Sequence, residues 1–402
     1  MTSIGPSPAA CGVTVRLGIL AAALFVVGTN AFVVAGLLPR IAEGLGTTAS
    51  RVSYTITLYA IVVAVASPVL SIVLAQRNRG RLMAFALGVI VAGTGITAVA
   101  TSLGTFEVGR VIAALGGAAL VPAATAAAPA LLPPAQRGRA LAIAGLGFTL
   151  AIALGSPLGT ALAGPGGWRL PLAALAAVGA VLAVVLLVVV RDVPLGAVAG
   201  MGARLRVLRS LAIVMTLGSA LLLTASFNVV YIFSAAVTMR ATGGSSRLLA
   251  TLLLAFGVGG IVGTSLAGRL TDRLGSRVMV AVALGGQVVV LALIPTLQGS
   301  YPVLAVDFFL WGAVAFAAVI PVQHRLVGID SATAGITLSW YSTATYIGIA
   351  LAPVLGAAAL RGMVALTGAV VVPLVGAGLG LLALTLFLAG YSRWCPSRPS
   401  VR

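Results

Sequence analysis

The chain has 402 residues, of which 60% are hydrophobic and only 7% are charged, and this composition excludes a soluble globular domain. All 24 basic residues are arginine; with six acidic residues they give a net charge of +18. No basic run is interleaved with aromatic residues, so the charge does not indicate nucleic-acid binding. We therefore expect an integral membrane protein.

Twelve apolar runs are long enough to cross a bilayer, which requires about 20 residues each. We predict them to be helices, because lipid cannot satisfy an open backbone and the alternation typical of a β-barrel is absent. The N-terminus lacks the features of a cleaved signal peptide, so the first run is expected to be retained as a span. The predicted spans are 17–38, 53–74, 82–101, 106–131, 140–162, 170–190, 211–236, 248–267, 278–296, 302–321, 333–358 and 364–389.

Arginine in short loops predicts the orientation. With the N-terminus inside, 17 of the 24 arginines fall on the cytoplasmic side, six fall outside and Arg110 lies within a span. We expect a multi-pass protein of a bacterial plasma membrane with both termini cytoplasmic. Trp168 is predicted to anchor a span at the membrane surface, and His324 to lie in a solvated loop. Cys11 and Cys395 have no spacing typical of a disulfide or a metal site.

The longest basic interruption, at 191–209, separates six spans from six. We predict an all-α membrane protein with a six-helix bundle over 1–190, a cytoplasmic linker over 191–210 and a second six-helix bundle over 211–402. Transporters are often built from such repeated halves. A shift of 197 residues places SIVLAQRNRG (71–80) on GRLTDRLGSR (268–277), and Arg110 on Asp307.

The second of these loops contains Gly268, Asp272, Arg273, Gly275 and Arg277. It resembles the signature loop G-x-L-x-D-R-x-G-x-R of the major facilitator superfamily. The resemblance implies a tight turn at the glycines, and an aspartate set against a helix N-terminus of the other half, where an anion is stabilised. These residues would form a conformational latch. The alternative is that Asp272 balances neighbouring arginines in a solvated loop.

The first copy of this loop departs from the pattern. It has Ser71 in place of the first glycine, Ala75 in place of the aspartate and Asn78 in place of the second glycine. We therefore expect only one of the two latches to depend on charge.

The stretch GFTLAIALGSPLGT contains Gly147, Gly155, Pro157 and Gly159. It is similar to the fifth-helix motif of the twelve-helix drug:proton antiporters. Small residues allow two helices to approach closely, and proline adds a bend; generic small-residue packing is the alternative. Stretches beginning at Gly28, at Tyr231, at 253 and at 322 further resemble the chloramphenicol-resistance and arabinose-efflux group of that branch.

Glu107 stands at the start of a predicted span, whereas Arg110 and Asp307 lie more clearly within spans, where a charge near the helix centre costs about 2.5 to 3.5 kcal/mol on insertion scales. The resemblance implies that helices 1, 4, 7 and 10 line a central cavity, and that the arginine of helix 4 takes part in proton coupling. Arg110 and Asp307 would then face each other across the cavity and respond to protonation. Alternatively, Glu107 pairs with Arg110 on one helix face.

Four polar or aromatic residues of the cavity helices are candidates for substrate binding, although each also suits interhelical packing. They are Asn30, Asn228, Tyr231 and Trp311. Where the family commonly has an acidic residue in helix 1, this chain has Asn30 and Ala31, which favours neutral or weakly polar substrates over cations.

The sequence lacks the acidic, histidine and cysteine cluster of a hydrolase and the phosphate-binding loop of an ATPase. We predict a secondary active efflux transporter, not an enzyme, that exchanges protons for a small antibiotic of chloramphenicol type. Export of sugars or nucleosides is the alternative, and a non-transporting sensor on the same fold is the second. We expect a monomer in the bilayer, with a small-molecule substrate and protons as partners and no cofactor, metal or nucleic acid.

Overall fold

The computed structural model describes residues 8–74, 77–133, 136–190, 200–330, 333–362 and 368–392, and these form helices and turns without a strand. The helices before residue 191 are α1 (Pro8–Gly44), α2 (Ala49–Val73), α3 (Arg79–Ala98), α4 (Leu103–Ala130), α5 (Arg137–Leu150), the π-helix η2 (Ala151–Gly155), α6 (Ser156–Gly166) and α7 (Arg169–Val189). The later helices are α8 (Met201–Val207), α9 (Leu211–Ile232), α10 (Ser234–Val237), α11 (Met239–Thr242), α12 (Ser246–Leu297), α13 (Tyr301–Ala317), α14 (Val319–Ile329), α15 (Ala334–Gly362) and α16 (Gly368–Ser392).

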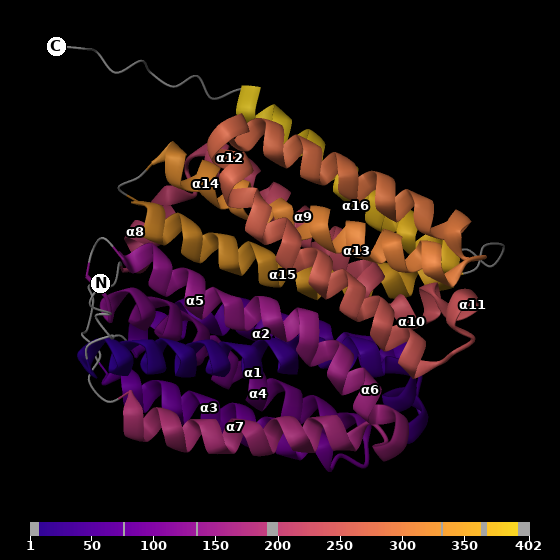
Figure 1. The fold of residues 1–402 in the computed structure, drawn as a ribbon, viewed down its shortest axis with the longest axis horizontal. Helices are drawn as coiled ribbons and strands as arrows, with labels where there is room; N and C mark the ends of the chain where they lie inside the picture. Colours follow the sequence, from indigo (N-terminus) through magenta and orange to yellow (C-terminus); the bar gives the residue numbers. More distant parts are fainter. Residues whose placement is uncertain are drawn as a thin grey trace, which may run out of the picture.

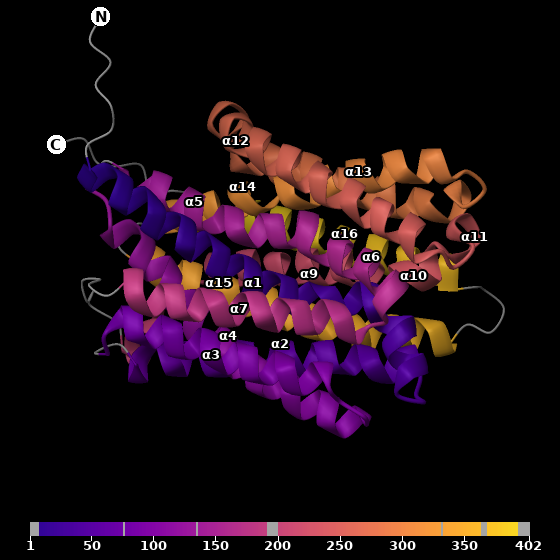
Figure 2. The same cartoon turned by 60° about the horizontal axis from the view of Figure 1, so that its bottom comes forward.

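The predicted twelve spans are present. The described residues contain 11 helices that are long and apolar enough to cross a membrane. One of them, α12, has 52 residues, which is about 78 Å of helix and more than twice the hydrocarbon thickness. Gly275, at φ 80° and ψ 156°, breaks its helical path. Figure 2 shows α12 folding back, so this element supplies two spans.

The tenth span differs from its prediction because helix continues past the apolar run. The segment α14 carries its buried residues Val322, Arg325 and Leu326 at helical spacing. Polar residues between them lower the hydropathy, and the predicted span therefore ends too early. His324 lies on the exposed face of this helix, so its assignment to a loop was wrong.

We call α1–α7 the first half and α9–α16 the second half. Figure 1 draws the first half, indigo to magenta, below the second half, rose to yellow. The end of the molecule where α1 begins and α16 ends is the terminal end, and the other is the opposite end. The division into bundles at 191–210 stays a prediction; residues 191–199 of this linker lie outside the described part.

The largest buried hydrophobic cluster joins both halves. The first half contributes α1 residues such as Val34 and α2 residues such as Ile56, and the second half contributes Val229 and Phe256. Helix α2 also packs along α15, and α6 packs against α12. A large part of the contact between the halves is therefore apolar and buried.

Candidate functional site

The charge of Arg110 is held by four helices of the first half. Arg110 of α4 is 1% exposed, and its Nη1 donates to the backbone oxygen of Asn30 at 2.7 Å and to Asn30 Oδ1 at 3.0 Å. Its guanidinium lies 4.2 Å from the ring centre of Tyr59 on α2. Asn30 donates from Nδ2 to Thr94 Oγ1 of α3 at 2.6 Å. We call these four residues the Arg110 cluster.

The Arg110 cluster contains no counter-charge. Among the described residues, Arg110 Nε and Nη2 have no hydrogen-bond partner, and neither has the hydroxyl of Tyr59. A buried cation needs compensation, which here comes from the ring of Tyr59 and the oxygens of Asn30. The structure pairs Arg110 with neither Glu107 nor Asp307 within its described part. A pair with Asp307 in another access state stays a prediction.

Asp307 of α13 carries a buried carboxyl group. It is 4% exposed, and its Oδ2 has no hydrogen-bond partner in the described part of the chain. Trp311 lies one helical turn later, is fully buried, and has an Nε1 that finds no partner in the same part. An ionised carboxylate in such surroundings is costly, whereas a protonated one is not. The free energy of this conformation therefore depends on whether Asp307 is protonated.

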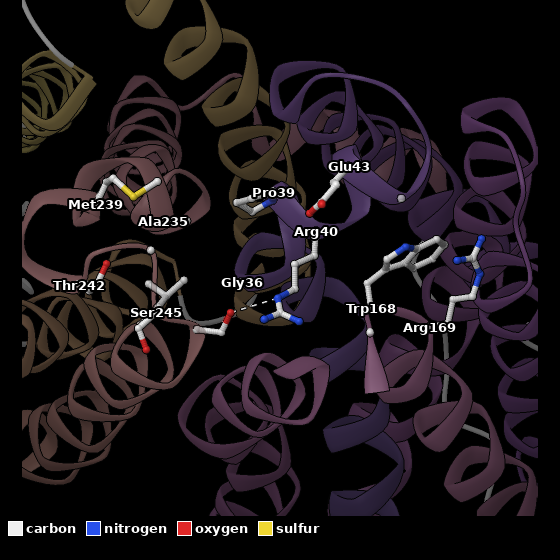
Figure 3. Close-up of a pocket in the computed structure, with 15 residues that line it drawn as sticks. Gly36, Pro39, Arg40, Glu43, Trp168, Arg169, Ala235, Met239, Thr242 and Ser245 are labelled. Carbon is white, nitrogen blue, oxygen red and sulfur yellow. Dashed lines mark hydrogen bonds between the residues drawn. The ribbon is translucent and has the colours of Figure 1, made fainter. Parts of the chain in front are cut away.

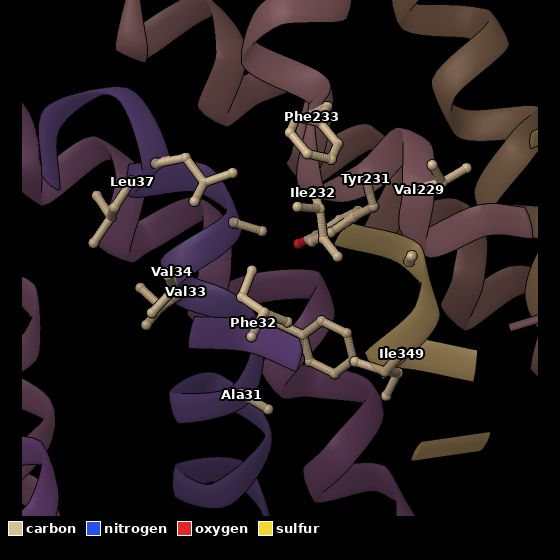
Figure 4. Packing of buried hydrophobic residues seen from close by; sticks show 14 of the residues in the cluster. Ala31, Phe32, Val33, Val34, Leu37, Val229, Tyr231, Ile232, Phe233 and Ile349 are labelled. Carbon is tan, nitrogen blue, oxygen red and sulfur yellow. The ribbon is translucent and has the colours of Figure 1, made fainter. Parts of the chain in front are cut away.

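A chain of aromatic rings connects the two halves near these charges. Phe32 of α1 packs edge-on against Tyr231 of α9, with ring centres 6.0 Å apart and planes at 89°. Tyr231 lies 5.3 Å from Phe256 of α12, and Phe256 lies 4.5 Å from Trp311 of α13. Figure 4 shows the side chains of Phe32, Tyr231 and Ile349 near one another, from α1, α9 and α15. We call Phe32, Tyr231, Phe256 and Trp311 the aromatic chain.

The structure separates the four candidate substrate residues into two groups. Tyr231 and Trp311 contact the same ring and carry polar atoms without a hydrogen-bond partner among the described residues. Asn228 donates to Thr224 O at 2.9 Å, and its Oδ1 likewise has no partner there. Asn30 differs, because its side-chain oxygen and nitrogen are both engaged within the Arg110 cluster.

Sequence reasoning missed Tyr59 and Phe256. The phenol of Tyr59 stands alone within the apolar run TITLYAIVVAVA, and a solitary tyrosine at mid-membrane is a usable signal. Phe256 has no such signal, because an apolar ring in an apolar helix looks the same whether it faces lipid or protein.

The fifth-helix motif lies along α1. A Cβ placed on Gly147 would be 1.9 Å from Ala21 O, one on Gly155 would be 2.1 Å from Thr29 Oγ1, and one on Gly159 would be 2.3 Å from Val33 Cγ2. The three glycines of the fifth span thus meet three residues of the first span that have the same spacing along the chain. Pro157 lies at the start of α6, directly after the π-helical turn η2.

The π-helical turn η2 of the fifth span also contacts the second half. A Cβ on Gly257 of α12 would lie 2.1 Å from the Cα of Ala153 in η2. The backbones of α12 and η2 therefore approach each other closely across the boundary between the halves. Side chains larger than those present would separate the two halves at this point.

The signature loop forms a turn at the terminal end, where Gly275 adopts a positive φ that L side chains rarely adopt. Gly268, Arg273 and Arg277 belong to the same stretch of α12, and the Arg277 guanidinium lies 5.6 Å from the ring centre of Tyr391. Asp272 is exposed in this state. A contact between Asp272 and a helix N-terminus in another state stays a prediction.

A cavity of about 660 Å³ lies between the halves at the opposite end. Figure 3 shows Arg40 extending across it from α1. Arg40 Nε donates to Ser246 Oγ of α12 at 3.1 Å, and its Nη1 donates to Ala163 O of α6. Glu43 and Arg169 also line the cavity. Arg40 is therefore a bridge between the halves at this end.

A second bridge at the opposite end joins Arg361 Nη2 of α15 to the hydroxyl of Tyr54 on α2 at 3.0 Å. Trp168 lies at the same end but is only 4% exposed. Its ring centre lies 5.8 Å from that of Phe106, and the Arg169 guanidinium lies 4.3 Å from the Trp168 ring centre. Its prediction as a membrane-surface anchor was wrong, because the tight turn after α6 directs the indole into the first half.

Among the described residues, no group of three or more His, Cys, Asp or Glu side chains could hold a metal ion.

The chain is similar along most of its length to bacterial membrane transport proteins. It is 31% identical over 373 residues to the inner membrane transport protein YdhP of Escherichia coli K12, covering 91% of this chain and 93% of the relative. It is 30% identical over 364 residues to the chloramphenicol resistance protein of Streptomyces lividans, covering 86% and 88%.

Solved structures show the same fold. A mutant of the nucleoside transporter NupG superposes with a TM-score of 0.77 at 13% identity, covering 94% of this chain and all of that one. A bacterial homologue of the lysosomal transporter Spinster, inward-facing and occupied, gives 0.76 at 17% identity, covering 98% and 100%. The family model of the Major Facilitator Superfamily matches residues 20–353. The chain therefore belongs to the Major Facilitator Superfamily, a family of membrane transporters and not of enzymes.

Proposed function

We propose that the protein is a proton-driven exporter of a small, neutral or weakly polar aromatic molecule of the chloramphenicol type. It would expose a central site alternately to the two sides of a bacterial plasma membrane, with the terminal end in the cytoplasm. The similarity to the Streptomyces lividans protein, which extends along most of both chains, supports the substrate class. The arginine-rich loops of the terminal end support the orientation.

The composition of the aromatic chain is the structural observation that carries the proposal. Its rings offer stacking surface, and Tyr231 OH, Trp311 Nε1 and the nearby Asn228 Oδ1 are polar atoms without a partner in the described part of the chain. A ligand with an aromatic ring and several hydroxyl or amide groups would match these rings and polar atoms. No carboxylate stands in α1 at Asn30 or Ala31 to select a cation.

Proton coupling would use Asp307 as the carrier. A protonated Asp307 is compatible with the buried position seen here, whereas an ionised one would favour a state in which water or a cation reaches it. Arg110, with two nitrogens that bond to none of the described residues, is the candidate cation. Each proton that enters the cell then supplies about 2.3 kcal/mol per 100 mV of membrane potential.

Transport by inverted membrane vesicles tests the substrate class. Vesicles with an acidic lumen would be given radiolabelled chloramphenicol, pentoses or nucleosides, with vesicles lacking the protein as the control. We expect accumulation of chloramphenicol that a protonophore abolishes. Accumulation of a sugar or a nucleoside but not of chloramphenicol would show that the protein exports that class of compound instead. Binding of a compound without accumulation of any would favour a non-transporting sensor.

A further inference from the structure

The linker helix α8 is docked on the second half. Val207 is 8% exposed and packs in a cluster with Leu326 and Ala344 of α14 and α15. Trp340 of α15 donates from Nε1 to the backbone oxygen of Arg204 at 2.9 Å. These contacts fix the position of Arg204 relative to the second half.

From this position Arg204 reaches the first half. Its Nη2 donates to Ser71 Oγ of α2 at 3.1 Å, and its Nη1 donates to Ser339 Oγ of α15 at 3.3 Å. Ser71 in turn donates to Pro68 O at 2.8 Å, so its hydroxyl hydrogen is used and a lone pair can accept from Arg204. Arg204 is 9% exposed although its helix lies outside the spans. Burial lowers the pKa of Arg204, which remains a cation.

Ser71, which accepts this hydrogen bond from Arg204, lies at the position of the signature loop in the first half. Under the 197-residue shift, Ser71 corresponds to Gly268, the first glycine of the signature loop. The same loop of the first half has Ala75 in place of the aspartate, so it has no acidic group of its own for a latch. A charged contact nevertheless reaches this loop position, and it comes from the linker.

We propose that Arg204 is an inter-half clamp that replaces the missing charge-based latch of the first half. Helices α2 and α15 are bonded at three levels: Tyr54 to Arg361 at the opposite end, Thr57 Oγ1 to Ala350 O at 2.8 Å farther along α2, and Ser71 to Ser339 through Arg204 at the terminal end. Separation of the terminal ends of α2 and α15 requires breaking the third contact. The linker thereby sets how readily this end opens, whatever the substrate.

Spin-label distances between the terminal ends of α2 and α15 test the clamp without any substrate. Labels at Val73→Cys and Gly335→Cys, in a background without native cysteines, would be measured by double electron–electron resonance in lipid nanodiscs. Arg204→Ala is compared with Arg206→Ala, which removes an equal charge from an exposed position of the same helix. We expect Arg204→Ala to raise the ratio of long to short distances about tenfold and Arg206→Ala to leave it unchanged.

Two further variants separate a clamp from general damage to the fold. Ser71→Ala leaves the linker intact and should reproduce most of the Arg204→Ala shift, while the double variant should add little to either. Arg204→Lys should restore the short distance only in part, because an ammonium lacks the fork that spans two hydroxyls. Equal distributions for Arg204→Ala and Arg206→Ala, or fully additive effects of Ser71→Ala, would overturn the clamp. These distances are measured without chloramphenicol, so the proposal of the clamp and the proposal of the substrate can each be refuted without the other.

Discussion

Arg110 donates to Asn30 twice from one nitrogen, to the backbone oxygen at 2.7 Å and to the side-chain oxygen at 3.0 Å. The buried cation of α4 is thus tied to α1, and Asn30 is tied in turn to α3 through Thr94. This relationship gives Asn30 a role in holding the charge. An amide suits this position, since it both donates to Thr94 and accepts from Arg110.

Asn30→Ala should destabilise the protein, because Arg110 loses an acceptor inside the membrane. A hydrogen bond to a charged group contributes about 1.5 to 3 kcal/mol, and we expect a clear fall in the thermal unfolding temperature in detergent. Asn228→Ala is the matched control, since Asn228 is equally buried but bonds within its own helix. Equal losses in the two variants would contradict the special role of Asn30.

Gly147→Ala should disturb the contact of α5 with α1, because the new Cβ would lie 1.9 Å from Ala21 O. The neighbouring Gly145→Ala adds the same methyl group where nothing lies within 4 Å. Overpacking of this kind costs about 1 to 3 kcal/mol. The yield of monodisperse protein in size-exclusion chromatography should fall for the first variant and remain for the second. A normal yield of Gly147→Ala would show that the helices separate there without consequence.

Tyr231→Phe should weaken substrate binding while the fold stays intact, because the ring of the aromatic chain is kept and a hydroxyl without a partner among the described residues is removed. Tyr231→Ala should also reduce stability, by about 3 to 5 kcal/mol as for other large buried aromatic residues. Export assays at varied chloramphenicol concentration, together with thermal unfolding, distinguish the two effects. An unchanged half-saturating concentration in Tyr231→Phe would remove this hydroxyl from the site.

Ser246→Ala removes the bond from Arg40 across the opposite end but leaves the bond of Arg40 to Ala163 O. We expect this end to open more often. A cysteine introduced at Leu249, a buried residue of the cavity wall, should then react faster with an impermeant maleimide added from that side. Ser265→Ala, an exposed hydroxyl bonded within α12, is the control. Identical rates in both variants would show that Arg40 does not hold the halves together.

The sequence predicts the spans and the turn at Gly275 well, because apolar length and a glycine requirement are local properties. It predicts the neighbours of the buried charges poorly. The partner of Arg110 is 80 residues away in the chain, and the direction in which each helix presents its side chains depends on packing between helices. The clamp through Arg204 depends on the docking of α8 and has no local signal beyond one basic residue among several.

The release of protons on addition of substrate tests the central claim most directly. In inverted vesicles with an acidic lumen, chloramphenicol should raise the lumenal pH, followed by a fluorescent pH probe, as protons leave in exchange. Glu107→Gln, which removes the half-buried acid of α4, should behave like the native protein. Asp307→Asn should bind chloramphenicol but release no protons. Undiminished proton release by Asp307→Asn would contradict the assignment of Asp307 as carrier, and transport of chloramphenicol by the native protein without any proton release would contradict antiport itself.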